Sequence, residues 1–277
     1  MSLIPWVRDL ISDMTVEQLV ESNGIFQYGN RSYDSLAASG ASSVLRQKLG
    51  GYTVRKNTGE APNAATRAKA KGDSSMVKTV LNTYGVGLQN EIAAQFESND
   101  ALRKEHTARM AEALREQFDA DFITAGMQTP HIYETVASGK LDWKDLIKVQ
   151  KHFRSKKVRM GTGKRVTIID TDLEDEFLSI DVIKQATAYS VMKLANGDSK
   201  YEFNGQTYFI SSLMPKVEGQ PCILGVHGSG LASIVSRFGV IKETWDSTLM
   251  ADIIDMIAQA AFELDGDEFA CIVKLKA

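Results

Sequence analysis

The chain has 277 residues, of which 43% are hydrophobic, so it can bury a sizeable core in one large domain or two. Its formal net charge of −3 argues against a nucleic-acid binder that relies on overall basicity. No apolar run approaches the roughly 20 residues of a membrane span, and the start, MSLIPWVRDL, lacks the basic residues and apolar core of a signal peptide. The two cysteines, Cys222 and Cys271, are typical of buried thiols in a reducing compartment. We therefore expect synthesis in the cytoplasm.

The N-terminal third is short of regular structure. Residues 15–22 predict a short helix with Thr15 as N-cap and Gln18 three places on. Residues 21–43 are rich in Gly, Ser and Asn and predict an irregular arm. Residues 52–86 then have strand-like ends around a polar, basic middle, NAATRAKAKGDSS, which is far longer than the usual hairpin loop of about two to five residues.

The most regular pattern in the chain predicts one long helix over residues 99–125. Asn99 is a suitable N-cap, and Gly126 is a natural residue just past the C-terminal end. The pairs Glu105–Arg109 and Arg115–Asp119 have the i,i+4 spacing of favourable ion pairs. The apolar residues that recur near the helical period are Leu102, Met110, Leu114, Phe118 and Phe122. Such a helix is about 39 Å long, and its single apolar stripe suits a position along a sheet.

The remaining elements alternate between helices and strands. We expect a helix at 142–156, a buried strand at 164–170, one or two helices over 170–197 and a hairpin at 200–212 with an Asn204–Gly205 turn. Residues 222–238 predict a strand, a Gly-rich turn and a helix. The segment 252–276 predicts two strands joined at Asp265–Gly266, with a helix as the alternative for the first. The chain is therefore α+β.

Three short motifs suggest chemistry but fail on detail. RMGTGKRVTIID lacks the phosphate-loop pattern, because Val158 replaces the first Gly and Arg165 replaces the Ser or Thr. DTDLEDE resembles a calcium loop, but Asp175 stands where Gly is needed and Asp181 stands where Glu is needed. HGSG has no accompanying Gly-x-Ser-x-Gly elbow. The four histidines, which lie far apart in the sequence without metal-ligand spacing, are His106, His131, His152 and His227. The sequence therefore predicts no catalytic residue, cofactor or metal site.

The order of these elements, together with four stretches, resembles the Hong Kong 97-type major capsid protein of tailed bacteriophages. The stretches are VTIIDTDLEDEFLS, ANGDSKYEFNGQTYFISSLMP, PCILGVHGSGLASIVSRFGV and LDGDEFACIVKL. The resemblance covers nearly the whole chain and implies a set of named parts. These are an N-terminal arm (1–51), an extended E-loop (52–90), the first part of a peripheral (P) domain with the spine helix (91–176), an axial (A) domain (177–260) and a closing strand returning to the P domain (261–277).

The resemblance implies a structural protein without enzymatic activity. Such a protein assembles into hexamers and pentamers of an icosahedral virion capsid around double-stranded DNA, which the mixed-charge inner face would hold without sequence readout. The E-loop would lie on a neighbouring subunit, because an isolated two-stranded hairpin is marginally stable. Its basic tip would meet an acidic surface, for which Glu174, Asp175 and Glu176 are a candidate. The predicted tip contacts are Arg67, Lys69 and Lys71.

Other partners follow from the same resemblance. We expect a portal, a separate scaffolding protein that meets the helix at 15–22, and a decoration protein in some lattices. Lys69 and Lys71 are the lysines available for a covalent cross-link, but no partner Asn and acid are identified, so we predict non-covalent interlocking. One alternative is an encapsulin, a cellular nanocompartment of the same fold that binds a cargo peptide. The other is a soluble α+β enzyme with an unrecognised site.

Overall fold

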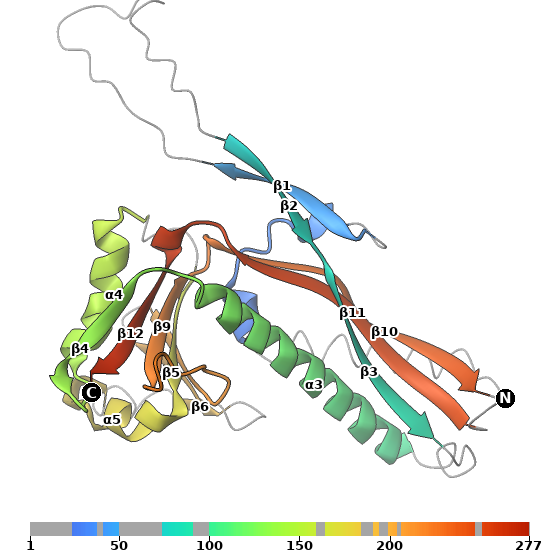
Figure 1. The fold of residues 1–277 in the computed structure, drawn as a ribbon. Coiled ribbons are helices and arrows are strands. Elements are labelled where there is room, and N and C mark those ends of the chain that lie inside the picture. The colour runs from blue at the N-terminus through green and yellow to red at the C-terminus, as the bar shows by residue number, and fades with distance from the viewer. Residues whose placement is uncertain are drawn as a thin grey trace, which may run out of the picture.

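The computed structural model describes most of the chain in one α+β arrangement (Figure 1). The described residues are 24–37, 41–49, 74–90, 100–158, 164–183, 191–193, 199–203, 206–246 and 251–276. The predicted helix at 15–22 and the middle of the E-loop lie outside them. Two parts lie side by side, one built on a long helix and a three-stranded sheet and the other on a seven-stranded sheet, and a two-stranded ribbon extends beyond them.

The predicted long helix is confirmed. Helix α3 (Asp100–Gly126) has 27 residues, and it lies along the three-stranded sheet with most of its contacts on the central strand. On its outer side Arg109 and Glu105 form an ion pair of 2.6 Å. Its buried side chains share one face and recur at three- and four-residue intervals: Met110, Ala111, Leu114, Phe118, Phe122 and Ile123.

The sheet beneath α3 is antiparallel, in the order β10–β11–β3. Its strands are β3 (Asn82–Asn90), β10 (Leu231–Asp246) and β11 (Ala251–Leu264). Figure 1 shows β10 and β11 as a long hairpin running beside α3 for most of its length. We refer to α3 and these strands as the long-helix part.

The seven-stranded part is a mixed sheet in the order β4–β12–β9–β5–β8–β7–β6. The pairs β12–β4 and β5–β8 are parallel, and the remaining pairs are antiparallel. The strands are β4 (Ile132–Ser138), β5 (Arg165–Asp170), β6 (Val191–Lys193), β7 (Ser199–Phe203), β8 (Gln206–Ser211), β9 (Cys222–His227) and β12 (Ala270–Lys276). The buried strand predicted at 164–170 is therefore confirmed as β5.

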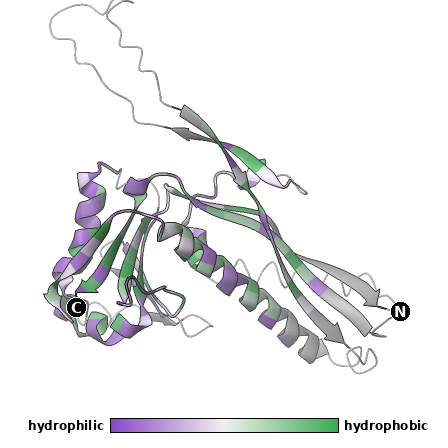
Figure 2. Ribbon diagram, in the orientation of Figure 1, coloured by the Kyte–Doolittle hydropathy of each residue, from purple (hydrophilic) through white to green (hydrophobic). Residues whose placement is uncertain are grey.

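Helices cover one face of this sheet. Helix α4 (Trp143–Ser155) matches the predicted helix, and its N-terminus is closed by a capping box between Asp142 and Asp145. The short helices η3 (Thr171–Leu173) and α5 (Glu174–Ser179) follow β5. Apolar residues from α4, α5 and the strands form one core cluster there. Figure 2 shows hydrophobic residues along the strands and hydrophilic residues over much of α4.

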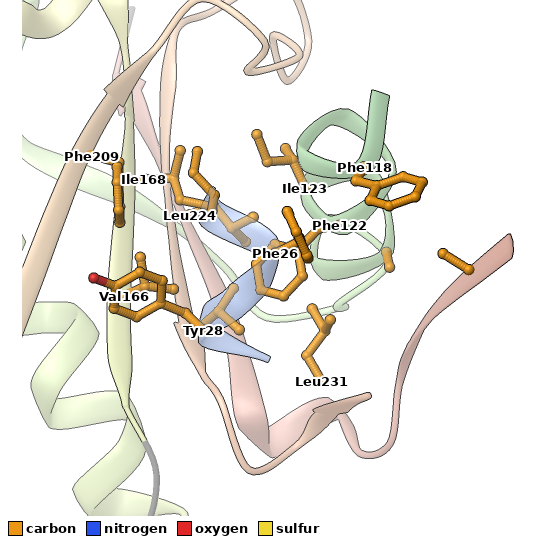
Figure 3. Packing of buried hydrophobic residues seen from close by; sticks show 14 of the residues in the cluster. Phe26, Tyr28, Phe118, Phe122, Ile123, Val166, Ile168, Phe209, Leu224 and Leu231 are labelled. Atoms are coloured by element: carbon orange, nitrogen blue, oxygen red, sulfur yellow. The ribbon is translucent and has the colours of Figure 1, made fainter. Parts of the chain in front are cut away.

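The other face of the sheet meets α3 through a wedge from the N-terminal region. The short helix η1 (Ile25–Tyr28) is buried between the two parts (Figure 3). Phe26 makes an edge-to-face contact with Phe118 of α3 at 5.5 Å, and its backbone N–H donates to the buried Asp119 at 2.8 Å. Tyr28 makes a similar contact with Phe209 of β8 at 5.3 Å. This wedge joins both parts into one core. A second short helix, η2 (Asp34–Leu36), follows on the surface.

The prediction of a helix after the Gly-rich turn is wrong. Residues 231–246 form β10, the longest strand of the structure's described part, paired with β11 from Leu231↔Leu264 to Asp246↔Ala251. All five side chains from 231 to 235 are buried, so this end of the strand is covered on both faces. A strand covered on both faces loses its alternation of apolar and polar residues, which makes a short apolar run ambiguous.

Two further expectations have different outcomes. The helix predicted to continue to residue 197 is wrong at 191–193, which form the edge strand β6 and pair with β7. The hairpin at 200–212 is confirmed as β7 and β8, and the pair Phe203↔Gln206 leaves a two-residue connection. The two C-terminal strands are confirmed as β11 and β12, with the short helix η4 (Asp267–Phe269) between them.

The two sheets draw their strands from interleaved stretches of the chain. Strands β7, β8 and β9 fall within residues 177–260, but they share a sheet with β4, β5 and β12. Strands β10 and β11, which begin in the same range, belong to the long-helix part. Each part is therefore assembled from several chain segments, which a linear division cannot express.

Candidate self-assembly surfaces

The ribbon that extends from the body consists of β1 (Ser43–Leu49) and β2 (Ser74–Val80). They pair antiparallel from Ser43↔Val80 to Leu49↔Ser74. The first strand therefore lies within residues 1–51, which the sequence assigned to the arm. Because β2 leads through Leu81 directly into β3, the base of the ribbon is continuous with the three-stranded sheet (Figure 1).

One face of the ribbon packs against the body. Val44 and Thr79, which are directly opposite each other, are both buried there. Val44 joins a small core cluster with alanine and isoleucine side chains of β10 and β11, including Ile234 and Ala261. This cluster attaches the ribbon base to the two long strands.

Arg46 is the polar anchor of the same face. Its side chain is only 1% exposed. The guanidinium donates to Thr79 Oγ1 at 2.6 Å, lies 2.5 Å from Glu263 of β11, and pairs with Asp265. Tyr33 lies against it, with its ring centroid 5.9 Å from the guanidinium carbon. Because a buried charge is costly unless it is paired and hydrogen-bonded, this network requires all of its members.

The sequence did not indicate this anchor. An arginine at the centre of a strand has the appearance of a solvent-facing residue, and its acidic partners are more than 200 residues away. The only signal is positional, because Arg46 occupies the same face as Val44 in a period-2 pattern. The structure shows that the arginine, and not an apolar residue, marks the packed face.

The opposite face of the ribbon is apolar and exposed. Leu45, Met76 and Val80 are each more than 60% exposed, although they lie on one face of adjacent strands. Lys78, which is paired with Leu45, adds a positive charge to this face. Single exposed apolar residues are normal, but a group on one ribbon face is typical of a contact surface. We name Leu45, Met76, Lys78 and Val80 the outer ribbon face.

We compared this architecture with known proteins. No protein-family model and no curated protein matches the chain. Solved structures do match. The capsid of Ralstonia phage GP4 aligns with a TM-score of 0.63 and 9% identity, over 93% of this chain and 90% of that chain. A chain of Mycobacterium phage Che8 aligns with a TM-score of 0.61 and 13% identity, over 91% of both chains. The chain has the Hong Kong 97-type capsid fold.

The same fold is also found in a bacterial compartment. The SrpI encapsulin from Synechococcus elongatus aligns with a TM-score of 0.58 and 9% identity, over 86% of this chain and 84% of that chain. The capsid fold recognised from the order of sequence elements is therefore confirmed. At these identities the likeness establishes the fold.

Of the residues predicted for subunit contact, the structure describes only the acidic group. Arg67, Lys69 and Lys71 lie outside the described residues. The acidic candidates begin α5, where Asp175 is exposed and Glu176 accepts the backbone N–H of Leu141 at 2.7 Å. Acidic side chains in the first turn of a helix are stabilised by its dipole. Glu176 therefore stabilises the subunit itself, whereas the Asp175 side chain is exposed at the surface.

A second exposed apolar surface lies on β4, an edge strand of the seven-stranded sheet. Ile132 and Val136 are 47% and 55% exposed on one face of the strand. Two backbone groups of this edge have side-chain partners, because Val136 N–H donates to Asp145 at 2.9 Å and the Glu134 carbonyl accepts from Lys148. Side chains that occupy the backbone of an edge strand oppose strand addition there.

The motifs with possible chemistry have structural partners. In the DTDLEDE stretch, Asp170 accepts the backbone N–H of Asp172 at 3.1 Å, and Asp172 pairs with Lys216 at 2.6 Å. Among the described residues, no three metal-ligating side chains are grouped. Both cysteines are free and buried as expected, and burial raises the pKa of the Cys222 and Cys271 thiols to about 12. Within the described ranges, no helix is long and apolar enough to span a bilayer.

The histidines are less dispersed than the sequence indicated. The rings of His131 and His152 are in tilted contact with their centroids 4.8 Å apart, and His227 lies 5.8 Å from the ring of Phe153. Each of these three has a structural contact, and among the described residues none of the three is grouped with a carboxylate and a nucleophile in a catalytic arrangement.

Proposed function

We propose that this chain is the structural major capsid protein of a tailed bacteriophage, which assembles into hexamers and pentamers of an icosahedral shell around double-stranded DNA. The observation that carries the proposal is the end-to-end likeness to the GP4 phage capsid, with about nine-tenths of each chain aligned. The ribbon adds independent support, because one of its faces is apolar and has no partner within the described residues of its own chain.

The neighbouring subunit is the partner that best suits the outer ribbon face. A two-stranded ribbon covered on one side is marginally stable in water, whereas a second covered side adds buried apolar area. The basic tip residues Arg67, Lys69 and Lys71 would then meet the acidic start of α5, at Glu174, Asp175 and Glu176, by charge complementarity that sets register. The interlocking is non-covalent in this proposal.

We assign the long-helix part, with α3 as spine helix, to the peripheral domain of the capsid fold. We assign the seven-stranded part to the axial domain. This assignment keeps the predicted parts but replaces the linear boundaries, because sheet membership alternates along the chain. The virion capsid is the location, with synthesis in the host cytoplasm and with scaffolding, portal and decoration proteins as partners.

The runner-up function is an encapsulin-like shell, which the SrpI alignment favours. The two shells differ in content, since one encloses a genome and the other a protein cargo. An enzyme is the weaker alternative. A pocket of about 420 Å³ lies beside η1, and its lining includes Tyr28, Arg31 and Lys164 but no histidine, cysteine or carboxylate.

Electron microscopy of the purified protein, expressed with and without its scaffolding protein, tests the proposal. We expect closed shells; a monomer or small dimer in both conditions would overturn it. Chemical analysis of shells from infected cells then distinguishes the two containers, because packaged double-stranded DNA supports a capsid and a specific protein cargo supports an encapsulin.

A deletion tests the role of the ribbon directly. Removing residues 63–75 takes away the basic tip while leaving β1 and almost all of β2. We expect a folded subunit that fails to assemble. Normal shells from this variant would contradict the inter-subunit role of the tip, even if the full chain forms a capsid.

A further inference from the structure

Three connections between the two parts of the subunit meet at one place. Residues 127–131 lead from α3 to β4, residues 228–230 lead from β9 to β10, and residues 265–269 lead from β11 to β12. The second and third are joined by a hydrogen bond from Asp265 N–H to the Gly230 carbonyl at 2.7 Å. We name these three segments the junction.

The junction is closely packed, and its glycines are required by space. A Cβ atom on Gly228 would collide with the carbonyl oxygen of Tyr28, and one on Gly230 would collide with the ring of Phe269. Thr129 Oγ donates to the Ala270 carbonyl at 2.9 Å. A change in one segment is therefore transmitted to the others.

His152 of α4 ties this junction to the seven-stranded part. Its side chain is buried, with Nε2 3.2 Å from the Glu268 carbonyl and Nδ1 3.0 Å from the Tyr133 hydroxyl. Because a carbonyl oxygen only accepts, Nε2 must carry the hydrogen. In the neutral ring Nδ1 then accepts from the Tyr133 hydroxyl. The two contacts suit a neutral ring that carries its hydrogen on Nε2.

Aromatic rings extend this contact across the junction. The ring of His152 lies tilted against His131, with the centroids 4.8 Å apart, and contacts the ring of Phe153 at 5.6 Å. Phe153 contacts His227, and His227 lies 6.2 Å from Phe269. The chain of rings therefore reaches residues in or beside all three junction segments.

We propose that His152 is a proton-operated latch, which in its neutral form holds residues 265–269 against α4 and β4 and releases them when it is protonated. Protonation places a hydrogen on Nδ1. The Tyr133 hydroxyl, which donated to that nitrogen, must then turn and accept. The Nε2–H bond to the Glu268 carbonyl is kept, but the imidazolium is buried beside His131, and the free-energy cost of burying this charge favours opening of the junction.

The charged and titratable groups around His152 set the direction of this response. Burial lowers the pKa of His152, His131 and Lys156 lower it further, and the Glu268 backbone and carboxylate oppose them. The lowered pKa means that an open or unfolded junction binds the proton more tightly than the closed one. The closed state is therefore fully stable above the ordinary histidine pKa of about 6.5, and it loses stability as the pH falls below that value. Tyr133 and Cys271, which lie on the β4 and β12 side, stay protonated in this range because burial raises the pKa of both.

Hydrogen exchange measured by mass spectrometry on the assembled, full-length protein tests the latch. After correction for intrinsic rates, we expect protection of residues 264–270 to fall at least tenfold between pH 7.5 and pH 5.0, while β5 and β9 change little. The variant His152→Gln retains a donor and an acceptor but cannot titrate, so its protection should stay within twofold over that range. His106→Gln, which removes a histidine from the N-terminal half of α3, is the matched control and should respond as the unsubstituted protein does.

Two further measurements keep the proposal falsifiable if His152→Gln does not fold. Tyr133→Phe removes the donor to Nδ1, which should raise the pKa of His152 and move the loss of protection to higher pH. Exchange of the imidazole C2 hydrogen reports the pKa of His152 in the unsubstituted protein. A value of 6.5 or above, or a loss of protection that is equal in the protein and in His152→Gln, would overturn the latch.

Discussion

The seven-stranded part and the ribbon are built from the same kind of element, but they differ in what covers them. Every side chain of β8 and β9 is buried, because α4 and α5 cover one face of their sheet and α3 with η1 covers the other. The ribbon is covered on one face only, by a small cluster and the Arg46 network. In the first region the described chain itself covers both faces of the sheet, whereas in the second the outer ribbon face stays exposed among the described residues.

This difference predicts two classes of variant. Substitutions in the core between the parts should lower the free energy of unfolding and therefore reduce every later step. Substitutions on the outer ribbon face should leave the subunit stable and affect assembly alone. The four predictions below test that separation, in order of decreasing effect on the stability of the subunit.

Phe26→Ala should have the largest effect. The ring is fully buried between α3, β11 and the seven-stranded part, with Phe118 at 5.5 Å and Phe262 at 6.4 Å. Loss of a buried phenylalanine side chain costs about 3–5 kcal/mol. Urea unfolding of the unassembled protein measures this loss. A change below about 1 kcal/mol would mean that η1 is not part of the core.

Arg46→Leu should cause the next largest loss in the free energy of unfolding. Removing one partner of a buried ion pair typically costs about 3–5 kcal/mol, and we expect the lower end because Glu263 is one-third exposed. Hydrogen exchange should increase in β1 and β2 but not in β5. Arg109→Leu is the control, because its exposed pair with Glu105 is worth about 0.3–0.5 kcal/mol. Equal losses in the two variants would show that the buried network does not hold the ribbon.

The double substitution Leu45→Ser and Met76→Ser separates folding from assembly most clearly. Both side chains are more than 60% exposed in the subunit, so the free energy of unfolding should change by no more than about 0.5 kcal/mol. Shell yield in electron micrographs should nevertheless fall steeply. Leu36→Ser, at an exposed position on η2 outside the ribbon, is the control and should assemble normally. Normal shells from the double variant would mean that another surface carries the contact.

The thiols of the two cysteines should be unreactive in the folded subunit. A thiol with a pKa of about 12 is almost entirely protonated at pH 8, and it is the thiolate that reacts. Cys222 and Cys271 should therefore resist thiol reagents in the native protein and react after denaturation. Rapid modification of the native subunit would indicate that one face of the seven-stranded sheet opens readily.

Several features were predictable because their signals are local. The long helix follows from caps and a repeating apolar stripe, the helix at 142–156 was found within one residue at each end as α4, and the β7–β8 hairpin follows from its Asn-Gly turn. The order of these elements was enough to indicate the capsid fold. Each signal depends on residues within a few positions of one another, so a single sequence displays it fully.

Other features were not predictable because they depend on partners far away in the chain. The sequence predicts a helix after the Gly-rich turn because burial on both faces removes the alternation typical of a strand. Only the pairing with β11 makes residues 231–235 a strand. Arg46 finds Asp265 across 219 positions of sequence. His131 and His152 meet only when β4 and α4 pack together. In each case the deciding interaction is a contact that no local pattern encodes.

The sequence by itself therefore determined the long helix, α4 and the β7–β8 hairpin, and enough of the element order to indicate the fold, because helix caps, turns and apolar periodicity act over a few residues. The tertiary structure decided which strands share a sheet, which ribbon face stays open, and which titratable groups meet at the junction. The physical reason is that burial, ion pairing and strand pairing require segments far apart in the sequence to pack against each other and exclude water. The outer ribbon face is exposed because no described segment of the chain packs against it.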